Sequence, residues 1–247
     1  MERTQAKWEG SRACVFDTEE YEHVLPLNPI LFQDDFLGAW TAIPDVGVGL
    51  ESGCVWAKKT VETLGAPSVA ITANGANGYV QISIDATVEP QGANLYMADD
   101  RRFNITQGVV FETRIKGTVD PTLLGEGVWG LVGDWAAPDA ITYSVFFTVD
   151  GSGEIFCEKD DNNTDQSATS GVTGVITEWN VFRIDCRDVT DIKFFINGNR
   201  VASGTTFPYI ATGANATLQP FFAIYKSGGA GLGTMQVDYV RIWGNRS

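Results

Sequence analysis

The sequence predicts an all-β sandwich of two antiparallel sheets that follows an N-terminal arm. After residue 30, apolar and polar residues alternate over many short segments, which is the pattern of strands with one buried face. The chain contains 27 glycines. Gly, Asn and Asp fall between the alternating segments, where tight turns favour them. No segment shows the 3.6-residue period of a long helix.

The composition is that of a globular protein able to fill one large β domain. Of the 247 residues, 44% are hydrophobic and 19% are charged, and 31 acidic against 17 basic residues give a net charge of -14. That charge argues against nucleic acid and anionic membranes as partners. The N-terminus lacks the apolar core of a secretory signal, and no apolar run is long enough to cross a bilayer. We therefore expect synthesis in the cytoplasm.

Residues 1–29 differ from the rest of the chain and are interpreted as an arm outside the main domain, with a short helix. They mix charges with spaced aromatic residues and end at Pro26 and Pro29. His23, the only histidine, is expected to be a surface residue. The side chains expected to anchor the arm or join subunits are Trp8, Phe16, Tyr21 and Leu25. They pack either on the arm's own domain or on another subunit.

The strands of the main domain, residues 30–247, are expected in chain order. Alternation is clearest in YVQISID (79–85), VVFETRIKG (109–117), TYSVFFTVD (142–150), VFRIDC (181–186) and IKFFIN (192–197). In the first of these, Val80, Ile82 and Ile84 share one face. The segments VDGSGE (149–154) and INGNRV (196–201) have the Gly and Asn residues of hairpin loops. Each alternating segment is therefore predicted to be a half-buried antiparallel strand.

Three stretches of the main domain resemble one family. FQDDFLGAW (32–40) opens the β region, WNVFRIDCRDVTDIKFFINGNRVASG (179–204) follows, and MQVDYVRIW (235–243) closes it. Together they resemble the concanavalin A-like lectin and glucanase superfamily, a jelly roll of two curved sheets. The resemblance implies that the first and last strands pair side by side. It also implies a structural Ca²⁺ near those strands, with Asp238 as its candidate ligand; no other cofactor is expected.

The segment GSGEIFCEKDD (151–161) places Glu154 and Glu158 on one strand face. Glucanases of the superfamily carry Glu-x-Asp-x-Glu there: the first Glu is the nucleophile, the last is the acid/base, and the Asp tunes both. Here Phe156 takes the central position, and a phenyl ring cannot hydrogen-bond the nucleophile. We interpret the pair as a decoy at a hairpin start on an edge strand, with Glu158 and Lys159 solvated. No catalytic residue is therefore predicted.

Other candidate sites in the sequence are weaker. Trp135, in a loop of small and polar residues, is the candidate platform for a glycan, with a covering role as the alternative. DDNNTDQS (160–167) is rich in oxygen ligands but lacks the order of a calcium loop, so it is interpreted as a turn. The four cysteines match no metal-ligand spacing and are expected to be free, although a Cys157–Cys186 bridge stays open.

A glucanase-like scaffold without a working acid pair or an export signal leads to a structural hypothesis. We expect a bacteriophage capsid decoration protein, made in the host cytoplasm and carried on the virion surface. Its partners would be the major capsid protein or another virion protein, with homo-oligomers that are trimers by analogy. The first alternative is a carbohydrate-binding module that recognises a cell-surface glycan, and the second is a β-glucanase-like glycoside hydrolase.

Overall fold

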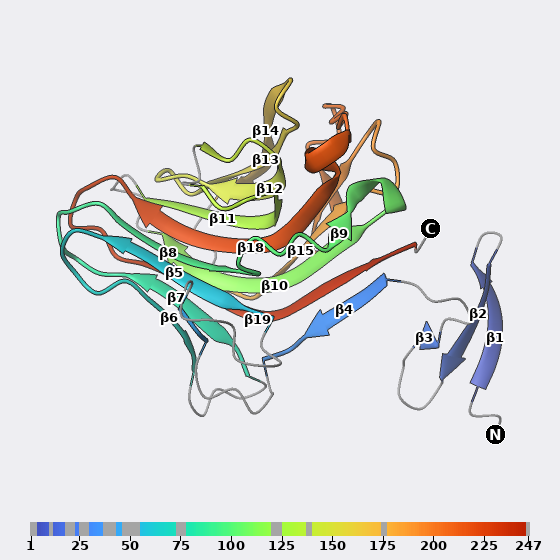
Figure 1. The fold of residues 1–247 in the computed structure, drawn as a ribbon, viewed down its shortest axis with the longest axis horizontal. Coiled ribbons are helices and arrows are strands. Elements are labelled where there is room, and N and C mark those ends of the chain that lie inside the picture. The colour runs from blue at the N-terminus through green and yellow to red at the C-terminus, as the bar shows by residue number, and fades with distance from the viewer. Residues whose placement is uncertain are drawn as a thin grey trace.

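The computed structural model describes residues 4–9, 12–17, 23–24, 30–36, 43–45, 55–72, 78–119, 125–136, 140–173 and 177–245. The main domain is a sandwich of two eight-stranded sheets (Figure 1). The first, called the β10 sheet, has the order β17 (Asn199–Val201), β16 (Lys193–Ile196), β15 (Asn180–Asp185), β10 (Val110–Val119), β19 (Gly233–Gly244), β7 (Val80–Ile84) and β6 (Ser68–Ile71), with β4 (Ile30–Asp34) also on β19.

The second sheet, called the β11 sheet, covers the inner face of the first. Its order is β14 (Asp165–Thr173), β13 (Glu154–Asp160), β12 (Ser144–Val149), β11 (Gly125–Val132), β18 (Thr217–Lys226), β8 (Gln91–Tyr96) and β5 (Ala57–Glu62), with β9 (Phe103–Asn104) also on β18. The helices in the described ranges are short 3-10 turns such as η1 (Ile105–Gln107) and η3 (Gly213–Ala216). Within those ranges, no helix is long and apolar enough to cross a membrane.

The core lies between the two sheets and is formed by the alternate apolar residues that the sequence pattern identifies. Val80, Ile82 and Ile84 are buried on β7, and Phe182, Ile184 and Cys186 are buried on and after β15. Trp129 of β11 stacks on Phe147 of β12, with ring centroids 6.0 Å apart. The opening strand β4 pairs antiparallel with the closing strand β19. These observations confirm the predicted jelly-roll sandwich and the pairing of its first and last strands.

The predicted half-burial is wrong for TYSVFFTVD, because every residue of β12 is buried. Val145 and Phe147 face the core between the sheets, whereas Phe146 faces outward into a second apolar cluster. Ile141, in the loop between β11 and β12, belongs to that outer cluster. The outer face of β12 is therefore covered by its own connecting loop, which a period-two pattern cannot reveal.

The helix expected in the arm is also wrong for its described part. β1 (Thr4–Glu9), β2 (Arg12–Asp17) and β3 (His23–Val24) form a separate three-stranded antiparallel sheet. The sequence between β1 and β2 is Gly-Ser, which favours a tight turn, and β2 contains the strand-forming residues Val15 and Phe16. Local turn chemistry and β-propensity therefore prevail over the helix that we expected.

Cys157 and Cys186 are buried free thiols, so the bridge that stayed open is not formed. Burial raises the pKa of both thiols well above the ordinary value. Cys14 and Cys54 lie where side chains are not described.

Candidate functional site

Strand β13 presents the predicted carboxylates on the outer face of the β11 sheet. Along Glu154–Asp160 burial alternates: Ile155, Cys157 and Lys159 point into the sandwich, while Glu154, Phe156 and Glu158 point outward. The predicted common face of the two glutamates is thus present. Glu154 begins the strand directly after the turn at Asp150–Gly153, as expected. β13 is not an edge strand, however, because β14 pairs along it.

Hydroxyl groups of β14 hold both glutamates. Ser167 donates its hydroxyl to Glu158 Oε1 over 3.2 Å, and Thr169 donates its hydroxyl to Glu154 Oε1. In the β13–β14 register Thr169 lies opposite Phe156 and Ser167 lies opposite Glu158. The Glu154 carboxylate therefore leans along the strand toward Glu158, past the phenyl ring between them. A register irregularity between Glu154 and Phe156 permits this lean.

The two glutamates are not equivalent electrostatically. Burial raises the pKa of Glu158 to about 7, and the negative charges of Asp165 and Glu126 add to that rise, while the hydrogen bond from Ser167 opposes it. Glu158 is half-buried rather than fully solvated as expected, and the buried Phe146 is the residue opposite it on β12. With its pKa raised in this way, the Glu158 carboxyl keeps a protonated form near neutral pH, and in that form it can donate as well as accept a hydrogen bond.

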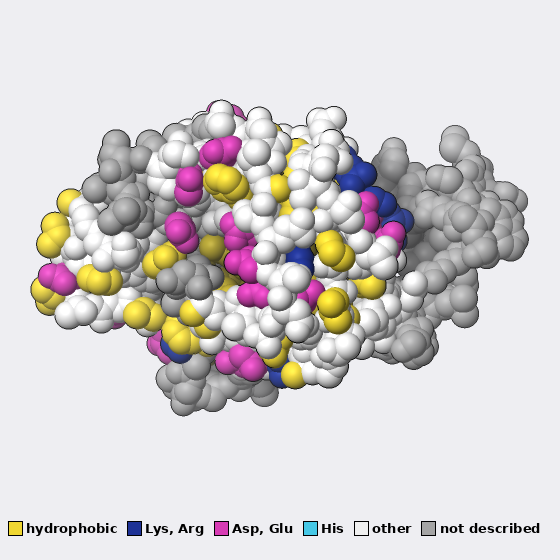
Figure 2. All heavy atoms as spheres, turned by 90° about the horizontal axis from the view of Figure 1, so that it is seen from above, with side chains coloured by type: hydrophobic (Ala, Val, Ile, Leu, Met, Phe, Trp, Pro, Cys, Tyr) yellow, Lys and Arg dark blue, Asp and Glu magenta, His cyan; other side chains and the backbone are white. Residues whose placement is uncertain are grey.

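An apolar cluster lies next to these acids on the same outer face. Its buried members are Tyr96, Val128, Val132, Ile141, Phe146, Phe221 and Ala223, and Trp135 packs against it. The Lys59 ammonium lies 3.1 Å from the centroid of the Trp135 ring. Because Trp135 has an apolar cluster and a cation against it, the structure favours the covering role over an open platform. Figure 2 is viewed from the side on which β12, β13 and β14 lie in Figure 1, and it shows acidic side chains gathered among apolar ones.

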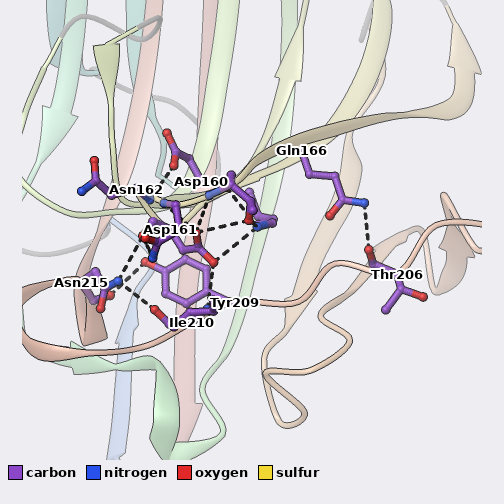
Figure 3. Close-up of polar contacts among 11 residues, drawn as sticks. Asp160, Asp161, Asn162, Gln166, Thr206, Tyr209, Ile210 and Asn215 are labelled. Atoms are coloured by element: carbon purple, nitrogen blue, oxygen red, sulfur yellow. Dashed lines mark hydrogen bonds and ion pairs between the residues drawn. The ribbon is translucent and has the colours of Figure 1, made fainter.

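The hairpin between β13 and β14 is anchored by a buried ion pair of Asp161, the residue at the centre of Figure 3. The Lys159 ammonium lies 3.4 Å from Asp161 Oδ2, and neither side chain is exposed to solvent. The expectation that Lys159 is solvated is therefore wrong, since its position in the β13 alternation turns it inward. Asp161 also accepts hydrogen bonds from the backbone N–H groups of Asn163, Thr164 and Ile210. These contacts fix the turn within DDNNTDQS that connects β13 to β14.

Asp238 lies on the closing strand, as expected for the candidate Ca²⁺ ligand. Its carboxylate forms an ion pair with Arg114, whose Nη1 lies 2.8 Å from Asp238 Oδ2. In the described part of the chain, no group of three or more His, Cys, Asp or Glu residues could hold a metal ion. The Arg114 guanidinium thus already supplies a counter-charge to the Asp238 carboxylate.

The arm residues cannot be placed in a site. Tyr21 and Leu25 lie outside the described residues, and for Trp8 and Phe16 only the strands that contain them are described. Sequence reasoning also missed Ser167 and Thr169, the hydroxyls that hold the glutamates. The sequence does show that these two hydroxyl residues are two apart on a polar strand. That spacing indicates contact with the glutamates only once the β13–β14 register is known.

Comparisons with known proteins identify the fold through structure rather than sequence. The chain matches no protein-family profile and no curated protein sequence. A glycoside hydrolase family 16 protein of Bacteroides ovatus, in complex with an oligosaccharide product, superposes with a TM-score of 0.58 at 14% identity, over 85% of this chain and 99% of that one. The carbohydrate recognition domain of Emp47p gives 0.52 at 9% identity, over 83% and 96%.

A third similar structure is an immunostimulatory antigen and pseudo β-1,3-glucanase of Mycobacterium tuberculosis. Its TM-score is 0.52 at 19% identity, over 87% of this chain and 98% of that one. These likenesses confirm the concanavalin A-like jelly roll. The neighbours are carbohydrate-recognition and glucanase-like proteins, and none of the three is a virion protein.

Proposed function

We propose that this protein is a non-catalytic carbohydrate-binding domain that holds a glycan on the outer face of the β11 sheet. The observation that carries the proposal is the common outward direction of Glu154, Phe156 and Glu158 on β13. Carboxylates accept hydrogen bonds from sugar hydroxyls, and an aromatic ring between them packs on the apolar face of a sugar. A few convergent polar groups beside apolar ones are typical of ligand sites.

The chemistry of the central position supports binding without cleavage. Phe156 offers no hydrogen bond to a nucleophile, and each glutamate is already hydrogen-bonded by a hydroxyl of β14. The similar fold of a pseudo β-1,3-glucanase supports a scaffold of this kind without hydrolysis.

The test combines binding with a search for turnover. Affinity electrophoresis of the full chain in gels containing lichenan or laminarin should show retardation. Glu154→Gln/Glu158→Gln should abolish it, and Glu89→Gln, a glutamate on the loop between β7 and β8, should not. Reducing ends should not accumulate. Equal mobility of all three proteins with and without glucan would refute binding at this face.

A glycoside hydrolase is the second candidate, and one observation favours it. The pKa of Glu158, raised to about 7, is the property required of a general acid at neutral pH. Accumulation of reducing ends from lichenan or laminarin, lost in Glu154→Gln, would establish this candidate and refute the non-catalytic proposal.

The role as a capsid decoration protein, with virion partners and a trimeric state, stays a prediction. Nothing in the comparisons supports it, and the arm on which it depends is described only in part. Deleting residues 1–29 should abolish attachment to particles and leave the sandwich folded; attachment by the truncated protein would refute this role.

A further inference from the structure

The outer face of the β10 sheet, on the opposite side of the sandwich, carries arginines among aromatic rings. One row of outward residues crosses neighbouring strands in register, from β17 to β4: Arg200, Phe195, Arg183, Glu112, Arg241 and Gln33. At roughly 4.8 Å between strands, this row spans about 24 Å. A row of this length suits an extended polymer chain.

The arginines of this face are stacked on aromatic rings. Arg183 lies between Phe195 and Trp243, with its guanidinium carbon 5.8 and 5.2 Å from the two ring centroids. The guanidinium carbon of Arg241 lies 5.7 Å from the Tyr239 ring. Stacking holds a guanidinium by its flat face and leaves the N–H groups at its edge free to bind a planar anion.

Two of these guanidinium groups have N–H groups that are not engaged in hydrogen bonds. The Nη2 of Arg183 lies 3.9 Å from Asp185 Oδ2, beyond hydrogen-bond range, and the side chain is 34% exposed, so its Nη edge is open to a ligand. Among the described residues, the Nε of Arg183 is buried without a hydrogen-bond partner and does not reach solvent. Arg187 already donates to both oxygens of the Asp185 carboxylate, over 2.9 and 3.1 Å from its Nε. Arg241 is exposed and, within the same described ranges, forms no hydrogen bond or ion pair.

The charge of this face is opposite to that of the whole protein. Seven of the chain's 17 basic residues lie on or beside it: Arg114, Lys116, Arg183, Arg187, Lys193, Arg200 and Arg241. The acidic side chains that face them are Glu112, Asp185, Asp188, Asp191 and Asp238. A chain with a net charge of -14 therefore has one face with an excess of positive charge.

We propose that the outer face of the β10 sheet binds an acidic polysaccharide through the carboxylates of its uronic acid residues. The arginine edges bind the planar carboxylates, and the half-buried rings of Phe195, Tyr239 and Trp243 pack against sugar rings. This site is independent of the proposed glycan site on the β11 sheet.

The experiment measures binding of the full chain to immobilised polygalacturonate by biolayer interferometry, at low and at physiological salt. Arg241→Gln and Arg183→Gln should each lower the affinity by about tenfold, the loss expected for one charge-assisted hydrogen bond. Arg183→Lys, which keeps the charge but loses the flat fork, should also bind more weakly. Arg102→Gln removes the same charge from an exposed arginine that is paired with Asp100 away from this face, and it should bind like the wild type.

Two comparison ligands separate this proposal from its alternatives. Poly-L-glutamate carries carboxylates without sugar rings and should bind at least tenfold more weakly than polygalacturonate; equal binding would show that acidic peptide is the ligand and overturn the proposal. Absence of binding by the wild type, or an equal loss in Arg102→Gln, would overturn it as well. Glu154→Gln/Glu158→Gln should bind polygalacturonate normally, so failure of the β11-sheet site and failure of this one are distinguishable.

Discussion

Replacing Asp161 with asparagine should strongly destabilise the sandwich, because it leaves the Lys159 ammonium buried without a counter-charge. The pair has no solvent exposure, and its Nζ–Oδ2 distance is 3.4 Å. Asp161 Oδ2 also accepts the backbone N–H of Ile210 over 2.9 Å, so an amide nitrogen at that position would face two donors. Breaking a buried pair by removing one partner costs about 3–5 kcal/mol. We expect a loss of that size in the free energy of unfolding.

The assay is urea denaturation at pH 7, followed by tryptophan fluorescence and extrapolated to water. Asp100→Asn, which breaks the exposed pair with Arg102, is the matched control and should cost less than about 1 kcal/mol. Lys159→Met should cost less than Asp161→Asn, because the Asp161 carboxylate keeps its three backbone donors. A loss below about 1 kcal/mol for Asp161→Asn would refute the reasoning about the buried charge.

The same pair predicts a pH dependence. Burial acts to raise the pKa of Asp161, but the backbone N–H groups and the Lys159 charge outweigh it and lower that pKa to about 2. Because the folded-state pKa is below the unfolded value, the carboxylate stabilises the fold above about pH 4, and this contribution is lost as the pH falls toward 2. Asp161→Asn should therefore lose less stability than the wild type over that interval.

Three further changes, one of them with a matched control, test other parts of the structure. Glu158→Gln should gain stability relative to the wild type between pH 5 and pH 8, measured by thermal unfolding, because the raised pKa of Glu158 makes ionisation unfavourable in the folded state. Gly130→Ala should cost about 1–3 kcal/mol, since its Cβ would lie 2.5 Å from backbone atoms of β12. Gly204→Ala, which meets nothing within 4 Å, should leave the urea midpoint unchanged. Lys226→Met should cost about 2–3 kcal/mol in urea denaturation, because the buried Lys226 ammonium donates to three backbone carbonyl oxygens. An unchanged free energy of unfolding would contradict the stabilising role of these hydrogen bonds.

The sandwich could be predicted because its strands alternate, and alternation reports burial directly. Alternation predicted the inward residues of β7, β10, β15 and β16. The pairing of β4 with β19 was implied by the family resemblance that the opening and closing stretches carry. Alternation failed for β12, whose outer side is covered by a loop, and for Lys159, whose charge suggested solvent although its position turns it inward. A period-two pattern cannot show which loop covers a face or which buried charge finds a partner.

The site was predictable only along one strand. Glu154, Phe156 and Glu158 share a face because they are spaced by two, which the sequence alone shows. The hydroxyls of Ser167 and Thr169 and the rise in the Glu158 pKa depend on pairing across strands. The row from Arg200 to Gln33 likewise joins residues far apart in the chain, so only the sheet order reveals it.

Backbone amide shifts of the full chain, recorded as a β-glucan tetrasaccharide is added, test the central claim most directly. A glycan held on the outer face of the β11 sheet should move the signals of Glu154–Glu158 and of Ser167–Thr169, leave those of β15 and β16 in place, and leave the sugar uncleaved. Unchanged signals on β13 and β14 at saturating sugar, or cleavage of the tetrasaccharide during the titration, would contradict it.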